Sequence, residues 1–124
     1  MDINDFKLTE ADVAGEFYRQ CCREGFKIRM EVKMPSDVHR SGFMRVDALI
    51  FDGSRIVCAV EFKNDRKHAA KPGSRQYKAY SGLEFPFFFC CGMSDIEETI
   101  YNVQALADSH DWQYKDEMAE LYQG

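Results

Sequence analysis

The sequence predicts an α/β fold in which a mixed four-stranded sheet is flanked by helices. Two observations support this prediction. First, the residue pattern along the 124-residue chain changes between helical spacing and strand alternation in the order helix, three strands, helix, strand, helix. Second, short loops join the first three strands, which favours an antiparallel meander. The fourth strand returns through a helix and is therefore expected to lie parallel to a neighbour.

A helix is expected near the start of the chain, from about Thr9 to Glu24. Thr9 is a residue type that caps helix N-termini, because its side-chain oxygen accepts a hydrogen bond from an early backbone N–H. Val13, Phe17 and Cys21 follow at intervals of four residues, which places them on one side of the helix. We expect this side to face the core.

Three strands are expected next. Apolar and charged residues alternate strictly over residues 26–34, which is typical of a strand with one solvent-exposed face. Residues 44–51 and 56–63 form two further apolar runs, and the Asp52-Gly53 pair between them is a strong hairpin signal. The run over 56–63 is nearly continuous, so this strand is expected to be central and well buried.

The second half of the chain predicts a helix over residues 74–80 and a strongly apolar strand over 85–91. A capping-box pattern at 94–97 then opens another helix, which runs to about residue 109. The remaining segment, 110–124, is expected to be an acidic helix or tail.

Composition indicates a soluble protein with a single domain over residues 1–124. No apolar run approaches the roughly 20 residues that cross a bilayer. The first residues are acidic and lack an apolar stretch, so neither a membrane partner nor a secretory signal is expected. The five cysteines lack a zinc-binding spacing. We interpret them as reduced thiols in a cytoplasmic protein.

Charge is distributed unevenly along the chain, whose formal net charge is −5. Six basic residues stand against two acidic ones between Glu61 and Lys78, whereas eight acidic residues and one basic residue follow from Asp95 to the end. Contact with nucleic-acid phosphates is therefore expected in the middle of the chain.

Candidate catalytic residues lie on the two strands that the hairpin joins. Glu61 and Lys63 are two residues apart on one strand, so their side chains leave the same face. Asp47 interrupts the neighbouring apolar strand. Two carboxylates in one cleft repel each other and favour a bound cation, and oxygen ligands suit Mg²⁺ or Mn²⁺. The plainer interpretation of Glu61 and Lys63 is an ion pair at a strand end.

The register of the hairpin decides whether the two carboxylates meet. A flush two-residue turn at Asp52-Gly53 would place Asp47 and Glu61 on opposite faces of the sheet. A three-residue loop or one bulge would place them on the same face. A shared metal site therefore predicts an irregularity in this hairpin.

Asp47, thirteen intervening residues and the triplet Glu61–Lys63 resemble the signature of the PD-(D/E)xK nucleases. The order of the elements is similar to the restriction-endonuclease-like core of that superfamily. Gln76 and Tyr80 resemble its QxxxY motif, and Glu16 resembles its helical glutamate. The small size is similar to that of phage-type VRR-NUC domains or Holliday-junction resolvases, and both branches stay open.

The resemblance implies a metal-dependent nuclease that hydrolyses DNA phosphodiester bonds, with branched or flapped DNA among its candidate substrates. Asp47, Glu61 and the backbone carbonyl of Phe62 would hold Mg²⁺ or Mn²⁺, and Lys63 would orient the attacking water or stabilise the developing charge. Glu16 would hold a second metal or position the nucleophile, unless it is a plain solvated helix residue.

The resemblance also implies roles for residues after the triplet. Gln76 would orient the metal shell or touch the phosphate. The basic residues of this region would hold the DNA backbone: Arg66, Lys67, Lys71, Arg75 and Lys78. A homodimer is left open. The alternative function is a catalytically silent binding module or inhibitor on the same scaffold.

Overall fold

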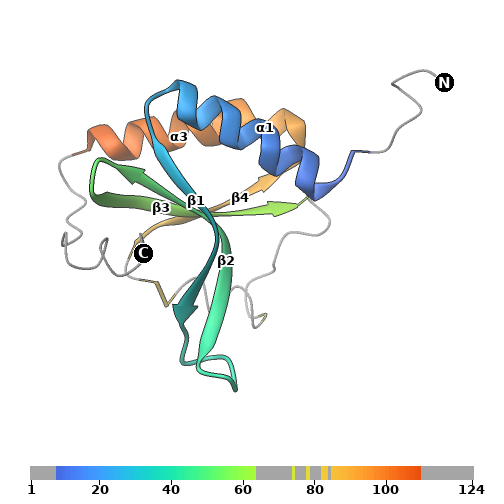
Figure 1. Cartoon of the computed structure of the whole chain (residues 1–124), viewed down its shortest axis with the longest axis vertical. Coiled ribbons are helices and arrows are strands. Elements are labelled where there is room, and N and C mark those ends of the chain that lie inside the picture. Colours follow the sequence, from blue (N-terminus) through green and yellow to red (C-terminus); the bar gives the residue numbers. More distant parts are fainter. Residues whose placement is uncertain (1–7, 64–73, 75–77, 79–81, 84, 110–124) are drawn as a thin grey trace.

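A four-stranded sheet in the order β1-β2-β3-β4 forms the centre of the fold (Figure 1). The computed structural model describes residues 8–63, 74, 78, 82, 83 and 85–109. Its elements are α1 (Glu10–Arg23), β1 (Lys27–Pro35), β2 (Phe43–Asp52), β3 (Arg55–Lys63), β4 (Phe87–Cys91), the 3₁₀ turn η3 (Met93–Asp95) and α3 (Ile96–Asp108). These bounds lie within about two residues of those expected from the sequence.

The sheet is mixed, as the element order predicts. Strands β1, β2 and β3 form an antiparallel meander, and β4 pairs with β3 in parallel. Strand β3 lies between two neighbours and is buried from Ile56 to Phe62, which confirms its central position. A nearly continuous apolar run is what such a position requires, because both faces of the strand are covered.

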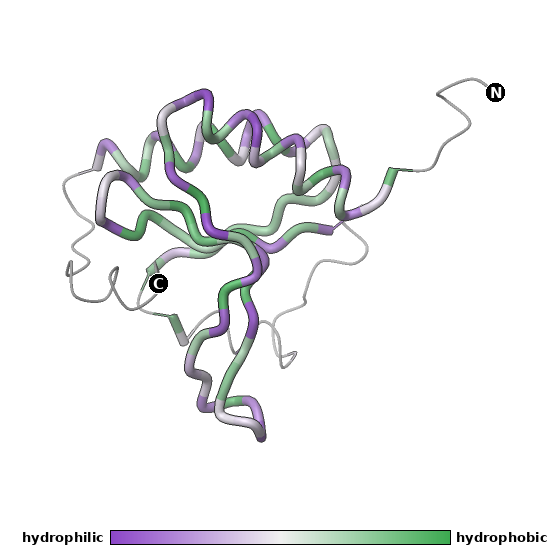
Figure 2. The backbone as a smooth tube through the Cα atoms, viewed as in Figure 1, coloured by the Kyte–Doolittle hydropathy of each residue, from purple (hydrophilic) through white to green (hydrophobic). Residues whose placement is uncertain are grey.

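Helices α1 and α3 both cover the same face of the sheet (Figure 1). Val13, Phe17 and Cys21 of α1 are fully buried there, and Ile100 and Val103 of α3 join the same core. The tube in Figure 2 is green along the central strands and carries purple along the helices, which is the amphipathic pattern of helices packed on a sheet.

A second core lies on the opposite face of the sheet. Met34, Leu49 and Phe51 pack there with Phe85, from the segment before β4. Of the helix expected over 74–80, the structure describes Ser74 and Lys78. Lys78 is helical, and its backbone N–H donates to the Ser74 carbonyl oxygen at 3.0 Å. The remaining residues of that helix, and segment 110–124, lie outside the described residues.

The two helix starts differ from each other. Thr9 caps α1 as expected, and Asp12 completes a capping box with it. The capping box expected at 94–97 is wrong, because α3 begins with no side-chain capping bond. The buried Asp95 carboxylate instead accepts a hydrogen bond from the backbone N–H of Cys91 at 2.9 Å, so it holds the end of β4 against the start of α3.

Strands β1 and β2 continue beyond the sheet as a two-stranded ribbon, residues 32–46, which we call the arm (Figure 1). The ribbon changes face where the arm begins. Ala48 of β2 belongs to the core under the helices, whereas Val46, two residues earlier, belongs to the opposite core. Strict alternation would keep both on one face, so the ribbon twists sharply at Asp47.

The hairpin between β2 and β3 contains the irregularity that the catalytic interpretation requires. Asp52 pairs with Arg55 around a two-residue turn, and the register then shifts between Phe51 and Ile50, so that Val57 has no partner in β2. This is a one-residue bulge.

Among the described helices, none is long and apolar enough to cross a membrane.

Candidate active site

Asp47 and Glu61 lie at a fork where β2 and β3 separate. The bulge sets the register so that Ala48 pairs with Val60, the last pair of this ladder. The next position along each strand is Asp47 on β2 and Glu61 on β3, so the two carboxylate residues stand level. Beyond this point β3 continues beside β4, whereas β2 turns into the arm (Figure 1).

The Asp47 carboxylate closes the end of the ladder. Its Oδ2 accepts a hydrogen bond of 2.8 Å from the backbone N–H of Phe62. Asp47 thus occupies the place that a backbone carbonyl of β2 would take if the ladder continued. A carboxylate offers about four acceptor positions on its two oxygens, so this bond leaves capacity for a further ligand.

Glu61 is a buried carboxylate with 7% of its surface exposed. Its Oε1 lies 3.7 Å from the Lys63 Nζ, so the expected ion pair is present. Burial of a charged group costs free energy unless a partner compensates it, and Lys63 supplies one. Between them, Phe62 points to the other face and packs on Phe17 of α1, with ring centroids 5.2 Å apart, which fixes the strand under the helix.

Glu31 of β1 adds a third acidic residue at the same level of the sheet. Its flanking residues Met30 and Val32 pair with Ala48 and Val46, so Glu31 stands opposite Asp47. Its φ is +54°, a left-handed conformation that costs a residue with a Cβ about 1–2 kcal/mol. The alternation over 26–34 indicates only that Glu31 is exposed, and no sequence signal marks its backbone.

A pocket of about 460 Å³ lies between α1 and the twisted part of the β1–β2 ribbon. Its lining combines three acidic residues with small and apolar ones: Glu10, Ala11, Ala14, Gly15, Tyr18, Met30, Glu31, Asp47 and Phe62. Asp47 therefore lines this pocket as well as bonding to β3. The volume falls in the range of small-molecule sites, but Glu61 and Lys63 are not among the lining residues.

Glu16 is held by residues of its own helix. Its carboxylate accepts hydrogen bonds from Arg19 and from Gln20, the latter at 2.8 Å. These bonds, with Arg19 as the larger cause, lower the pKa of Glu16 to about 2. A metal at Glu16 would have to compete with Arg19 and Gln20 for the carboxylate. Glu16 is also absent from the lining of the pocket that contains Asp47.

The remaining candidate residues after the triplet fall mostly outside the described residues. These are Gln76 and Tyr80 of the helical motif and the basic residues Arg66, Lys67, Lys71 and Arg75. Lys78 is described, and its side chain is exposed on a helical turn.

Sequence reasoning missed two cations close to the fork. Lys33 and Arg45 pair directly across the arm, and both are exposed. The excess of basic residues along the sequence instead predicts phosphate contact over residues 61–78. Strand alternation places Lys33 on the exposed side of its strand, but the register that pairs it with Arg45 across the loop 36–42 is seen only in the structure.

The donor groups at the fork suit a hard divalent cation. Mg²⁺ is commonly held by one or two carboxylates and keeps several waters or substrate phosphate oxygens, and Asp47 and Glu61 supply two carboxylates. Within the described part of the chain, no three His, Cys, Asp or Glu residues gather closely enough to hold a metal together. Asp47 and Glu61 alone would leave most of the ligand positions of such an ion to water and substrate oxygens.

No protein-family model matches this chain, and comparisons with curated proteins and with solved structures find no match either. The resemblance to the PD-(D/E)xK nucleases thus rests on the sequence motifs of this chain alone.

Proposed function

We propose that this protein is a divalent-metal-dependent nuclease with a restriction-endonuclease-like core, which hydrolyses DNA phosphodiester bonds at the fork between β2 and β3. One observation carries the proposal. A bulge at Val57 sets Asp47 level with Glu61, on the two strands that carry the nuclease-like motif. A hairpin without this bulge would have separated these carboxylates, so the register supports the proposal.

Each residue at the fork has a distinct task in this proposal. Asp47 and Glu61, with the Phe62 backbone carbonyl, would hold Mg²⁺ or Mn²⁺. When bound, such an ion polarises the scissile phosphate and acidifies a coordinated water. Asp47 is positioned for this task by its bond to the Phe62 N–H, which fixes the carboxylate relative to β3 before any ligand arrives.

Lys63 would act on the phosphate group. Its ammonium lies 3.7 Å from Glu61, longer than a hydrogen bond, so it can donate to a phosphate oxygen without leaving the Glu61 carboxylate. A fixed positive charge in a partly water-excluded site stabilises negative charge that develops in the transition state. Lys63 has 17% of its side chain exposed, which keeps it within reach of a substrate.

The proposal is tested by incubating the protein with labelled linear, flapped and four-way DNAs in the presence of Mn²⁺. We expect cleavage of at least one substrate, loss of cleavage in EDTA and loss of cleavage in the Glu61→Ala variant. Circular dichroism of the variant checks that it is folded. Robust cleavage by folded Glu61→Ala, or none by the unmodified protein on any substrate, would refute the proposal.

A second candidate is a catalytically silent binding module on the same scaffold. The observation that favours it is the Glu61–Lys63 ion pair, which already balances the buried carboxylate without a metal. Titration calorimetry with Mn²⁺ separates the two functions. Binding that disappears in Asp47→Asn supports the nuclease, and no measurable heat favours the binding module.

A further inference from the structure

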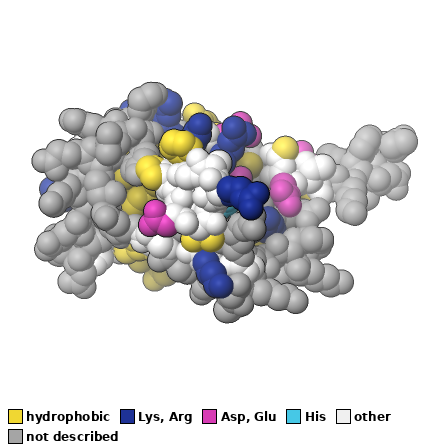
Figure 3. Space-filling view, turned by 90° about the horizontal axis from the view of Figure 1, so that it is seen from below, with side chains coloured by type: hydrophobic (Ala, Val, Ile, Leu, Met, Phe, Trp, Pro, Cys, Tyr) yellow, Lys and Arg dark blue, Asp and Glu magenta, His cyan; other side chains and the backbone are white. Residues whose placement is uncertain are grey.

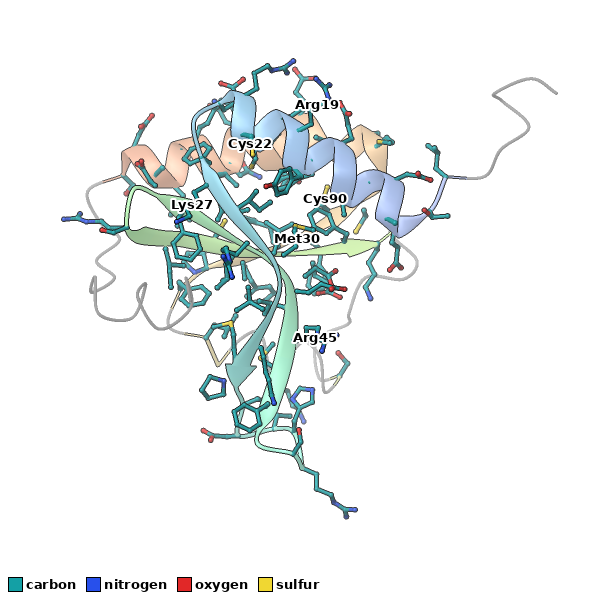
Figure 4. The ribbon with its side chains drawn as sticks, in the orientation of Figure 1. Arg19, Cys22, Lys27, Met30, Arg45 and Cys90 are labelled. Atoms are coloured by element: carbon teal, nitrogen blue, oxygen red, sulfur yellow. The ribbon has the colours of Figure 1, made fainter. Side chains whose placement is uncertain are left out.

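We propose that the Lys33–Arg45 pair on the arm binds the phosphate backbone of the DNA strand that enters the fork. This inference rests on the proposed nuclease function and extends it, because it assigns a DNA-binding surface to the arm. Figure 4 labels Met30, where the ribbon twists, and Arg45, further along the arm.

Position relative to the fork is the first argument. Arg45 precedes Asp47 by two residues, and Lys33 follows Glu31 by two residues. Two residues along a strand span roughly 7 Å. The two positive charges therefore lie two residues further along the arm than Asp47 and Glu31, past the point where the ribbon changes face. In this proposal, the DNA strand whose scissile phosphate lies at Asp47 continues along the arm to these two cations.

Electrostatics is the second argument. Lys33 and Arg45 are direct cross-strand partners, and like charges in such positions destabilise a sheet. Within the described residues neither side chain forms an ion pair with a carboxylate. A phosphate placed between them would remove this repulsion.

The apolar surroundings of the pair are the third argument. The Lys33 Nζ lies 4.3 Å from the centroid of the Phe43 ring, which holds the ammonium against the arm. Phe43 is itself 45% exposed. The space-filling view from below shows Lys and Arg side chains beside hydrophobic ones on this side of the molecule (Figure 3). Cations next to apolar side chains suit contact with both the phosphates and the sugar edge of a nucleic-acid strand.

The test compares two charge reversals on the same strand pair. Arg45→Glu reverses the charge beside the fork and leaves the Lys33–Phe43 contact in place. Lys27→Glu makes the same change in net charge at the far end of β1, where Lys27 is exposed opposite Phe51. Binding of labelled duplex DNA is measured by fluorescence anisotropy in EDTA, which prevents cleavage, at several salt concentrations.

We expect Arg45→Glu to weaken DNA binding about tenfold and to reduce the slope of log affinity against log salt by about 0.9, the value of one lost phosphate contact. Lys27→Glu should change affinity less than twofold. Arg45→Gln, which removes the charge without reversing it, should weaken binding by a smaller factor. Thermal unfolding should show Arg45→Glu to be at least as stable as the unmodified protein, because the like-charge pair is gone.

Equal effects of Arg45→Glu and Lys27→Glu, or no effect of either, would overturn the inference about the arm. If the unmodified protein still cleaves DNA in that case, the nuclease proposal stands without the arm. If the unmodified protein neither binds nor cleaves DNA, the proposed function itself fails and the inference falls with it.

Discussion

The Asp47 carboxylate and the Phe62 backbone N–H are joined by a 2.8 Å hydrogen bond at the point where β2 and β3 separate. This bond gives Asp47 a structural role in addition to its proposed role in metal binding. A buried backbone donor without a partner costs about 1–3 kcal/mol. Substitutions at Asp47 can therefore reduce activity for two separate reasons, and the choice of substitution must separate them.

Asp47→Asn and Asp47→Ala should differ in stability and agree in activity. Asparagine retains a side-chain oxygen that accepts from Phe62 N–H, whereas alanine removes it, so we expect Asp47→Ala to lose about 1–3 kcal/mol of unfolding free energy and Asp47→Asn to lose less. Both should lose Mn²⁺-dependent cleavage. Urea unfolding and a cleavage assay measure the two effects. Full activity in folded Asp47→Asn would exclude Asp47 as a metal ligand.

Lys63→Met should lower kcat about 10²–10³-fold, which is typical of removing one donor that stabilises transition-state charge. Methionine keeps much of the side-chain length and removes the charge. Single-turnover cleavage with excess enzyme measures the chemical step. Because Glu61 would lose its ionic partner, Mn²⁺ affinity is measured in parallel, and weaker metal binding alone would contradict the assignment of Lys63 to the phosphate.

Glu31→Asn should raise the unfolding free energy by up to about 1 kcal/mol. Asparagine tolerates the left-handed conformation better than glutamate, and Glu31 adopts a φ of +54°. Thermal or urea unfolding checks this, with Lys27→Asn as a control at an exposed position of the same strand. If Glu31→Asn is destabilised as much as the control, the left-handed backbone at Glu31 does not carry the expected strain.

Stability at low pH should depend on Glu16. Hydrogen bonds from Arg19 and Gln20 lower the pKa of Glu16 from 4.5 to about 2 in the folded state. The ionised side chain therefore stabilises the fold above pH 4.5, and this contribution is lost as the pH falls toward 2. Glu16→Gln should be less stable than the unmodified protein at neutral pH, and the difference should shrink across this window. A constant difference from pH 6 to pH 2 would contradict the lowered pKa.

Thiol reagents should modify one cysteine rapidly in the native protein. Cys22 is exposed, whereas the other four cysteines are buried. Burial raises the pKa of Cys21 to about 12 and that of Cys90 to about 11, and it raises the pKa of Cys58 as well, which suppresses the reactive thiolate. Intact-mass analysis after brief labelling should show a single adduct, absent in Cys22→Ser. Rapid labelling of more than one thiol would contradict the burial of the remaining cysteines.

Local patterns were enough to locate most elements of the fold. The spacing of Val13, Phe17 and Cys21 identified the buried side of α1, and the apolar run in β3 identified the central strand. These features are encoded within a few consecutive residues, so they can be read from the sequence alone. The start of α3 could not be read in this way, because the Asp95 carboxylate bonds back to Cys91 instead of capping its own helix.

The chemistry of the candidate site was also written in the sequence, as the residue types at positions 47, 61 and 63. Only the tertiary structure decided how Asp47 stands relative to Glu61. The turn itself has two residues, and a bulge at Val57 supplies the shift that sets Asp47 level with Glu61. The left-handed backbone at Glu31 and the change of face at Asp47 are likewise seen only in the tertiary structure. A one-residue shift of register depends on long-range packing of the buried face, and no local pattern contains that information.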